Sequence, residues 1–263
     1  MPDTINSAFI GAAFVGTAIL VVFACYFAAR RMLHPGEEGD RTYDMASTVA
    51  VRIAALHGLI LALVYAQELG DYKDIQSVLA QESIAVSDVF NDIRRYGGPE
   101  VAPVQAGLAD YLRIVVGEEW DLLGRREGLS PKAWTEWEAV YGRILDLDPT
   151  TPRETFLAGR LRERTAAIAG FRQSREVTAA GGFGGVFWAP ALIGLALLAV
   201  PFYSFRPTRT HLLLMATFGA YSGVILLFIY AFANPFEPPG KLEPLPFQRL
   251  LEGEIGRNLP PGG

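Results

Sequence analysis

The sequence predicts an all-α membrane protein with four transmembrane helices (2+2) and a helical bundle domain inserted between spans two and three. Hydrophobic residues make up 51% of the 263 residues, while the charged 19% gather in the middle of the chain. Apolar and charged residues therefore occupy separate segments of the chain. Apolar positions recur at helical steps of three and four residues, and alternating strand patterns are nearly absent.

The predicted organisation has four parts. Residues 1–66 hold spans one and two, 67–180 the soluble helical domain, 181–233 spans three and four, and 234–263 a proline-rich tail with a short amphipathic helix. The net charge is −5 and there is no basic tract, so we expect no nucleic-acid partner. A single cysteine, Cys25, excludes an intrachain disulfide.

The apolar segments define the four predicted spans. The first, Ser7 to Ala29, carries no charge over about 23 residues, enough to cross the lipid bilayer. The third is predicted from about Phe183 to Phe205, with kinks at Pro190 and Pro201. The fourth is predicted from about His211 to Ala233.

The second span belongs to the longest segment, Ser47–Tyr96, which contains no proline. As one helix it would be roughly 75 Å long, more than twice the hydrocarbon thickness. It would carry the fold from the bilayer into the soluble domain, with Gly70 as either a tolerated helix glycine or a hinge.

Three polar residues, His57, Tyr65 and Glu68, lie on the stripe of this helix and are candidates for a pore or a gate. Ionisable groups inside a membrane usually face protein or a water-filled cavity. The alternative for His57 is a neutral imidazole hydrogen-bonded to a neighbouring helix.

Helix boundaries in the soluble domain carry local signals. Gly97-Gly98 ends the first helix, and Pro99 opens the second. Ser130 followed by proline predicts an N-cap of the third. Thr151 and Glu154 have the capping-box spacing at the start of the fourth.

Charged residues interrupt the apolar stripes of three of these helices. Glu82 lies on the first, Glu118 or Glu119 on the second, and Arg164 and Arg175 on the fourth. Because an unpaired buried charge is costly, these residues predict a buried network of carboxylates and arginines. The alternative is an ion-coordinating or conducting site.

The sequence gives little support for a metal site or for an enzyme. No Glu is followed three residues later by His, and His34, His57 and His211 all lie outside the soluble domain, so di-iron and zinc sites are not expected. A hard-cation site of Glu82, Asp88 and Asp92 is a weaker alternative. Nucleophile, P-loop and dinucleotide motifs are missing, so we expect neither an enzyme nor a cofactor.

Several short stretches resemble a known family. They are Arg30-Arg31-Met32-Leu33, Gln81-Glu82-Ser83 with Val89-Phe90, Tyr111 with Glu119-Trp120, and NPF-x5-LEPLPF in the tail. Together with the 2+2 layout they resemble the bestrophin-like integral membrane family of bacteria. True bestrophins are homopentameric anion channels whose second span lines the pore. The resemblance implies an oligomeric channel. More specifically, it implies a pentamer that conducts anions.

Two alternatives stay open. The first is a non-conducting scaffold or accessory subunit in which Trp134, Trp137 and Tyr141 bind another protein.

The second alternative concerns the orientation of the protein in a bacterial inner membrane. Arginines in the short loops place those loops in the cytoplasm and the soluble domain outside, whereas the resemblance to true bestrophins implies a cytoplasmic domain. These loop residues are Arg30, Arg31, Arg41, Arg206 and Arg209.

Overall fold

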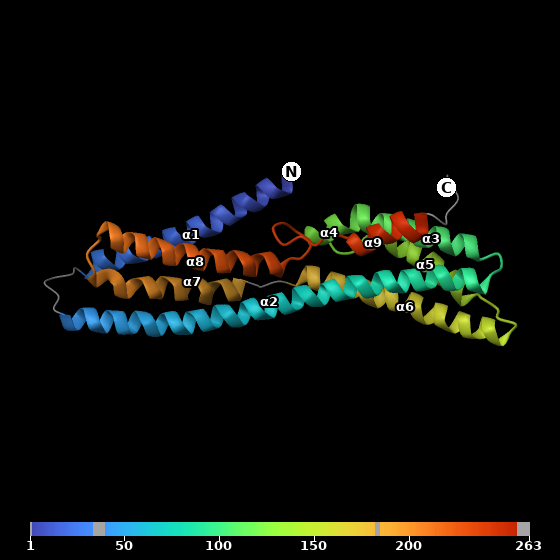
Figure 1. The fold of residues 1–263 in the computed structure, drawn as a ribbon, viewed down its shortest axis with the longest axis horizontal. Coiled ribbons are helices and arrows are strands. Elements are labelled where there is room, and N and C mark those ends of the chain that lie inside the picture. The colour runs from blue at the N-terminus through green and yellow to red at the C-terminus, as the bar shows by residue number, and fades with distance from the viewer. Residues whose placement is uncertain (1, 34–39, 182–184, 257–263) are drawn as a thin grey trace. The chain divides into compact units, whose positions relative to one another are not determined.

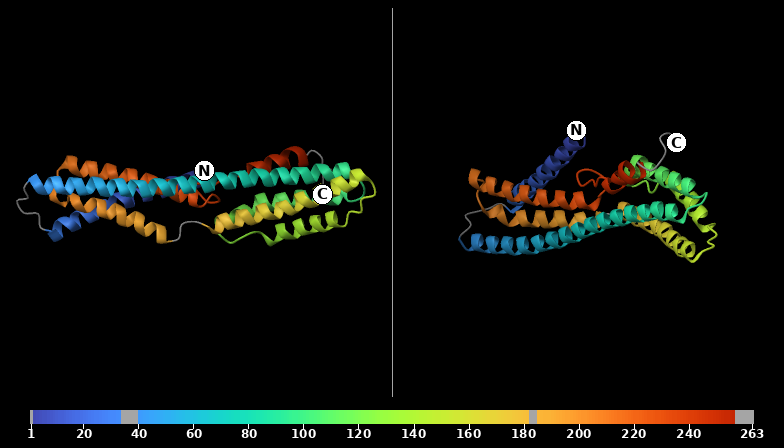
Figure 2. Two further views of the ribbon diagram at one scale, coloured as in Figure 1. Left: turned by 90° about the horizontal axis from the view of Figure 1, so that it is seen from below. Right: turned by 45° about the vertical axis from the view of Figure 1, so that its right-hand side comes forward.

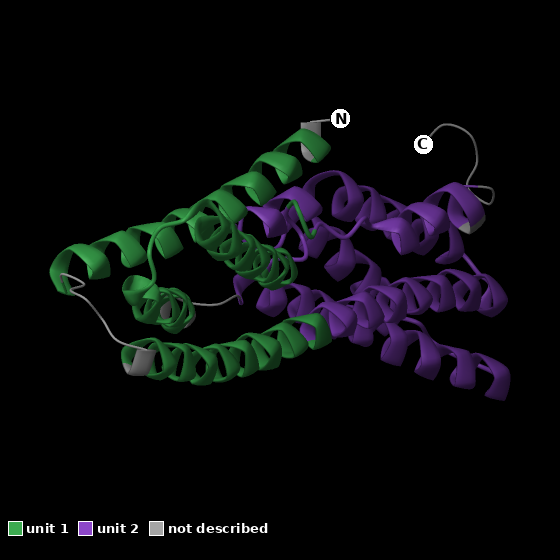
Figure 3. Cartoon of the chain, turned by 60° about the vertical axis from the view of Figure 1, so that its left-hand side comes forward, with its two compact units in different colours: residues 1–70, 182–233, 238–240 green, residues 71–181, 234–237, 241–263 purple. Residues whose placement is uncertain are grey.

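The computed structural model describes residues 2–33, 40–181 and 185–256, and every regular element within them is a helix. The chain forms two compact units (Figure 3). Unit 1 comprises residues 1–70, 182–233 and 238–240, and unit 2 comprises residues 71–181, 234–237 and 241–263.

Unit 1 contains the apolar helices, of which α1, α2, α7 and α8 are labelled in Figure 1. They are α1 (Pro2–Leu33), the first part of α2 (Asp40–Tyr96), α7 (Gly185–Ala199) with the short 3-10 helix η2 (Val200–Ser204), and α8 (Arg209–Ala233). Three segments are long and apolar enough to cross a membrane, namely Thr4–Leu33, Thr42–Tyr96 and Arg209–Ala233. The predicted third span corresponds to a shorter apolar helix, Trp188–Ser204, and its expected start at Phe183 lies outside the described residues.

Glycines set the contact between α1 and α8. A Cβ at Gly223 would lie 2.7 Å from the Cα of Val15, and one at Gly219 would lie 3.0 Å from the Cα of Ile19. Only residues without a side chain allow the two backbones to approach so closely. The GxxxG spacing on α8 therefore serves packing within one chain.

The helix α2 is continuous over 57 residues. It passes through Gly70, where an added Cβ would meet nothing within 4 Å, so this glycine is a tolerated helix residue and not a break. Gly97 ends the helix with φ +85°, and its N–H donates to the carbonyl of Ile93 at 3.0 Å. A positive φ at the helix end favours glycine.

Unit 2 is a helical bundle around one core. Its elements are the second part of α2, α3 (Val101–Ile114), the π-helical turn η1 (Val115–Glu119), α4 (Trp120–Gly124), α5 (Pro131–Leu145), α6 (Pro152–Ala180), α9 (Leu245–Leu250) and the π-helical turn η3 (Leu251–Ile255). Within this unit α6 runs beside α2 in the opposite direction (Figure 2).

The tail residues of unit 2 are part of its core. Phe247 and Ile255 are fully buried in the same cluster as the bundle helices. The indole N–H of Trp120 donates to the carbonyl of Leu242 at 2.7 Å, and the amide of Asn234 donates to the carbonyl of Gly124 at 3.2 Å. The predicted amphipathic tail helix is docked rather than free.

The two predicted N-caps behave differently. Thr151 forms the complete capping box with Glu154 at the start of α6. Ser130 precedes α5 without a side-chain cap, because its hydroxyl donates to Glu118 at 3.2 Å. This serine instead connects α5 to η1.

Candidate functional site

Four charged side chains meet inside unit 2, each with 0% exposure: Glu82, Glu119, Arg172 and Arg175. Arg175 Nε lies 3.0 Å from Glu82 Oε2, and Arg175 Nη2 lies 2.8 Å from Glu119 Oε1. Arg172 Nη2 lies 2.5 Å from Glu119 Oε2. Two carboxylates and two guanidinium groups give this buried quartet no net charge.

Polar and aromatic neighbours complete the quartet. The hydroxyl of Tyr111 donates to Glu82, and the backbone N–H of Ser130 donates to Glu119 at 2.9 Å. The guanidinium of Arg172 lies 4.2 Å from the ring centroid of Trp134. Contact with an aromatic face partly replaces the hydration that a buried guanidinium loses.

Burial shifts the ionisation of these groups. It raises the pKa of the Glu82 carboxyl, and the charge of Arg175 opposes that rise. Burial, followed by the charge of Glu82, raises the pKa of Tyr111 well above its ordinary value. For Arg175, desolvation works against the charged form, yet Glu82 and its other partners raise the net pKa. Arg175 therefore stays positively charged within the quartet.

Two residues expected in this network lie outside it. The side chain of Glu118 is 39% exposed and pairs with Lys132 at 2.7 Å, and that of Arg164 is 44% exposed and pairs with Asp88 at 3.2 Å. The π-helical turn at Val115–Glu119 delays the helical phase, which places Glu119 on the buried side.

Arg172 is the quartet residue that the sequence interpretation missed. The buried stripe of α6 follows Leu161, Thr165, Ile168, Arg172 and Arg175. We expected the step after Leu161 to fall on Arg164, which shifts the stripe by one residue. Steps of three and four residues are both helical, so the spacing alone permits either path.

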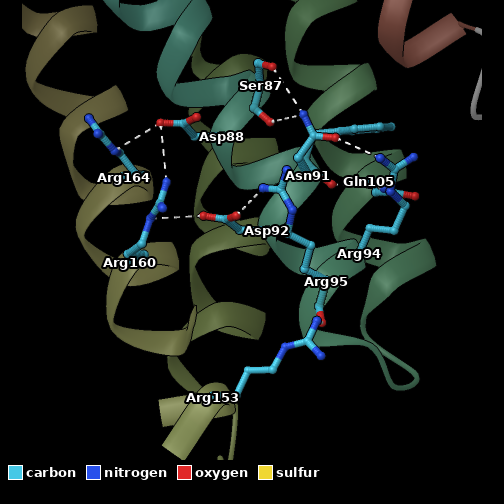
Figure 4. Close-up of polar contacts among 11 residues, drawn as sticks. Ser87, Asp88, Asn91, Asp92, Arg94, Arg95, Gln105, Arg153, Arg160 and Arg164 are labelled. Carbon is cyan, nitrogen blue, oxygen red and sulfur yellow. Dashed lines mark hydrogen bonds and ion pairs between the residues drawn. The ribbon is translucent and has the colours of Figure 1, made fainter. Parts of the chain in front are cut away.

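A second polar cluster lies further along α2 (Figure 4). Arg160 Nε lies 3.2 Å from Asp92 Oδ2, and Arg95 Nη1 lies 2.7 Å from Asp92 Oδ1. Arginines thus neutralise the aspartates proposed as hard-cation ligands, and Glu82 is held in the quartet instead. Among the described residues, no group of three potential ligands is placed to hold a metal ion.

The predicted pore residues lie on the covered side of α2. His57 is 5% exposed and Glu68 is 8% exposed. The ring of Tyr65 lies 5.8 Å from that of Phe232 on α8. A Cβ on Gly194 of α7 would lie 2.2 Å from His57 Nδ1, so this glycine makes room for the imidazole. Within the described residues, His57 Nε2 has no hydrogen-bond partner.

The opposite face of α2 in unit 1 is uncovered by its own chain. Leu56, Leu59 and Leu63 are 65%, 57% and 64% exposed. Arg52 and Gln67 lie in the same helical register and are also exposed. The uncovered face is thus an apolar stretch with a polar residue at each end, and we call these five residues the α2 outer stripe.

The aromatic residues of α5 are engaged within unit 2. Trp134 and Trp137 pack against the core, and the indole N–H of Trp137 donates to the carbonyl of Thr165 at 2.9 Å. Tyr141 stacks on Trp137 with ring centroids 5.0 Å apart.

Comparison with known proteins places this architecture in a class of helical membrane proteins. A family model described as the Bestrophin-like domain matches residues 16–247. The match spans most of the chain, which therefore belongs to the Bestrophin-like family.

A solved structure agrees with this assignment. The crystal structure of a bacterial bestrophin homologue from Klebsiella pneumoniae, carrying one substitution, is similar with a TM-score of 0.57. The match has 13% sequence identity and covers 94% of this chain and 98% of that chain. At this identity the likeness shows a shared fold. A search of curated protein sequences finds no match.

Proposed function

We propose that the protein is a homo-oligomeric membrane channel whose path is lined by the α2 outer stripe. The family assignment supports a channel-type function. The observation that carries the proposal is the pattern of the stripe, in which three exposed leucines lie between Arg52 and Gln67. An apolar constriction with polar ends is a form in which channels gate by dewetting.

Several copies of the chain are needed to build such a path, because a single α2 cannot enclose one. The outer stripes of the copies would face a common axis. Arg52 would favour anions at one end of the constriction. Five copies and anion conduction follow the resemblance to true bestrophins.

The buried stripe of α2 has a supporting role in this proposal. His57 and Tyr65 lie behind the path, against helices of their own unit, and Glu68 on the same stripe is also buried. A gate would then work by rotating or shifting α2 against α7 and α8, which changes the environment of His57. They are gating candidates rather than pore-lining residues.

The proposal includes the orientation of the protein in the membrane. We place the protein in a bacterial inner membrane, with the helix ends and short loops that bear Arg30, Arg31, Arg206 and Arg209 in the cytoplasm and unit 2 outside. An export-dependent reporter fused after Gly263 should be active. Fluorescence of a reporter that matures only in the cytoplasm would reverse the assignment.

The conduction experiment uses the full chain in liposomes and measures chloride efflux. Replacing Leu59 and Leu63 by alanine should widen the constriction and raise the efflux several-fold. The matched control replaces Leu213 and Leu214 of α8, which are 66% and 64% exposed, and should leave the efflux unchanged. Absence of efflux from all these proteins, combined with a monomer or a hetero-complex in detergent, would favour the scaffold alternative.

A further inference from the structure

A partly open cavity of about 280 Å³ lies between the helices of unit 1. Its size is close to the lower end for small-molecule sites, about 300 Å³. The walls are almost entirely apolar and come from every membrane helix of the unit. Among the lining residues are Val22 of α1, Ala50 and Ala54 of α2, Phe202 of η2, and His211 and Met215 of α8.

The apolar lining restricts what can fill this space. Water is poorly held where the walls offer it few polar partners. An empty cavity would also lose the dispersion contacts of its walls. Inside a bilayer, a lipid acyl chain needs no polar partners and restores the dispersion contacts of the walls.

Two polar residues, Ser47 and His211, line the cavity, and the hydroxyl of Ser47 already donates to the carbonyl of Asp44 at 3.0 Å. The imidazole of His211 lies between the rings of Tyr26, Phe202 and Phe205, with centroids 5.5 to 5.8 Å away. In the part of the chain that the structure describes, its Nε2 has no hydrogen-bond partner. An ester or headgroup oxygen of a lipid could supply that partner.

The charges around the cavity are mainly positive. Arg209 precedes the lining residue His211 by two positions. Arg30 donates to the carbonyls of Tyr203 and Phe205, next to the lining residue Phe202. The described acidic residue nearby is Asp44, one turn before Ser47 on α2. Basic pockets between membrane helices bind anionic headgroups.

We propose that this cavity is a binding site for an anionic phospholipid. One acyl chain fills the space between α1, α2, η2 and α8. The headgroup phosphate meets Arg209, and His211 Nε2 bonds an oxygen of the lipid. The site is separate from the proposed path and does not depend on conduction.

The test measures lipid retention by native mass spectrometry on the detergent-solubilised full chain, with phosphatidylglycerol, phosphatidylcholine or inorganic phosphate added. The wild type should retain phosphatidylglycerol in preference to phosphatidylcholine, and phosphate alone should have no effect. Ala54→Phe fills the cavity and should abolish retention. Ala55→Phe, at an exposed position outside the lining, is the matched control and should retain the lipid.

Two further variants separate the parts of the lipid. His211→Phe keeps the ring packing but removes Nε2, so retention of the lipid should fall about threefold to tenfold, as for one lost hydrogen bond. Arg209→Gln should weaken the preference for the anionic headgroup while phosphatidylcholine retention is unchanged.

Four results would overturn the proposal. They are equal retention of both lipids by the wild type, unchanged retention in Ala54→Phe, binding of inorganic phosphate alone, and a change of oligomeric state in Ala54→Phe with no lipid bound to either protein. The last result would assign the cavity to a second copy of the chain.

Discussion

The two halves of α2 belong to one helix but follow opposite rules. In unit 1 its outward face carries the apolar residues Leu56, Leu59 and Leu63. In unit 2 the outward positions include the charged residues Asp71 and Lys73. An apolar outward face fits a membrane span and, in the proposed path, a constriction that gates by dewetting, whereas a face exposed to water is polar.

The buried faces differ in a complementary way. The unit 2 half buries Glu82 within a quartet that neutralises it, whereas the unit 1 half buries His57 against a glycine. Charge pairing stabilises the unit 2 half of α2, and steric fit positions the unit 1 half. Substitutions in unit 2 should therefore act on stability, and those in unit 1 should act on the position of α2.

The largest expected effect is on the quartet. Arg175→Met leaves two carboxylates buried without their shared partner, which should lower the free energy of unfolding by about 3–5 kcal/mol. Arg164→Met removes an exposed pair on the same helix and should cost at most about 1 kcal/mol. Denaturant unfolding of the full chain, followed by tryptophan fluorescence, measures both values, because three of the four tryptophans lie in unit 2. Equal losses would show that the quartet is not what stabilises the bundle.

The next effect tests the steric fit in unit 1. Gly194→Ala would place a Cβ 2.2 Å from His57 Nδ1, so the ring must move, at a cost of about 1–3 kcal/mol. Adding His57→Ala should recover most of this loss, which a double-mutant cycle on thermal unfolding would measure. Gly58→Ala, where nothing lies within 4 Å, is the control and should not destabilise. Additive effects of the two substitutions would exclude the contact.

A smaller effect concerns Tyr111. Tyr111→Phe leaves Glu82 without one hydrogen bond and should cost about 1–3 kcal/mol at neutral pH. The raised pKa of Tyr111 means that the folded state keeps the phenol neutral above 10.0, the ordinary value at which the unfolded chain loses the proton. Its contribution is therefore complete below that pH and is lost as the pH rises through the folded-state pKa. The variant should show a flatter loss of stability at alkaline pH, and an unchanged profile would contradict the buried phenol.

Much of this fold follows from local sequence rules. Helical periodicity located α2 but left Gly70 open as a helix glycine or a hinge, and the Thr151–Glu154 pair located the start of α6. Periodicity placed Glu82 and Arg175 on facing stripes, but it could not choose between Glu118 and Glu119. That choice depends on a π-helical turn, which inserts a residue without a distinctive sequence signal.

The unit 1 details were less accessible to sequence. The polar stripe of His57, Tyr65 and Glu68 indicated one special face of α2 but not which neighbour it meets. Gly194 makes room for His57 from a different helix, far along the chain. Such a contact arises from tertiary packing and has no local spacing to reveal it.

The central claim is that the outer stripe of α2 lines a conducting path. Its most direct test places a single cysteine at position 59 (Leu59→Cys) in a Cys25→Ser background and measures chloride efflux from liposomes. A charged thiol reagent that cannot cross the membrane should block most of the efflux. The same reagent should leave the efflux of a Leu213→Cys control unchanged. Equal insensitivity of both variants, with efflux present in both, would contradict the claim.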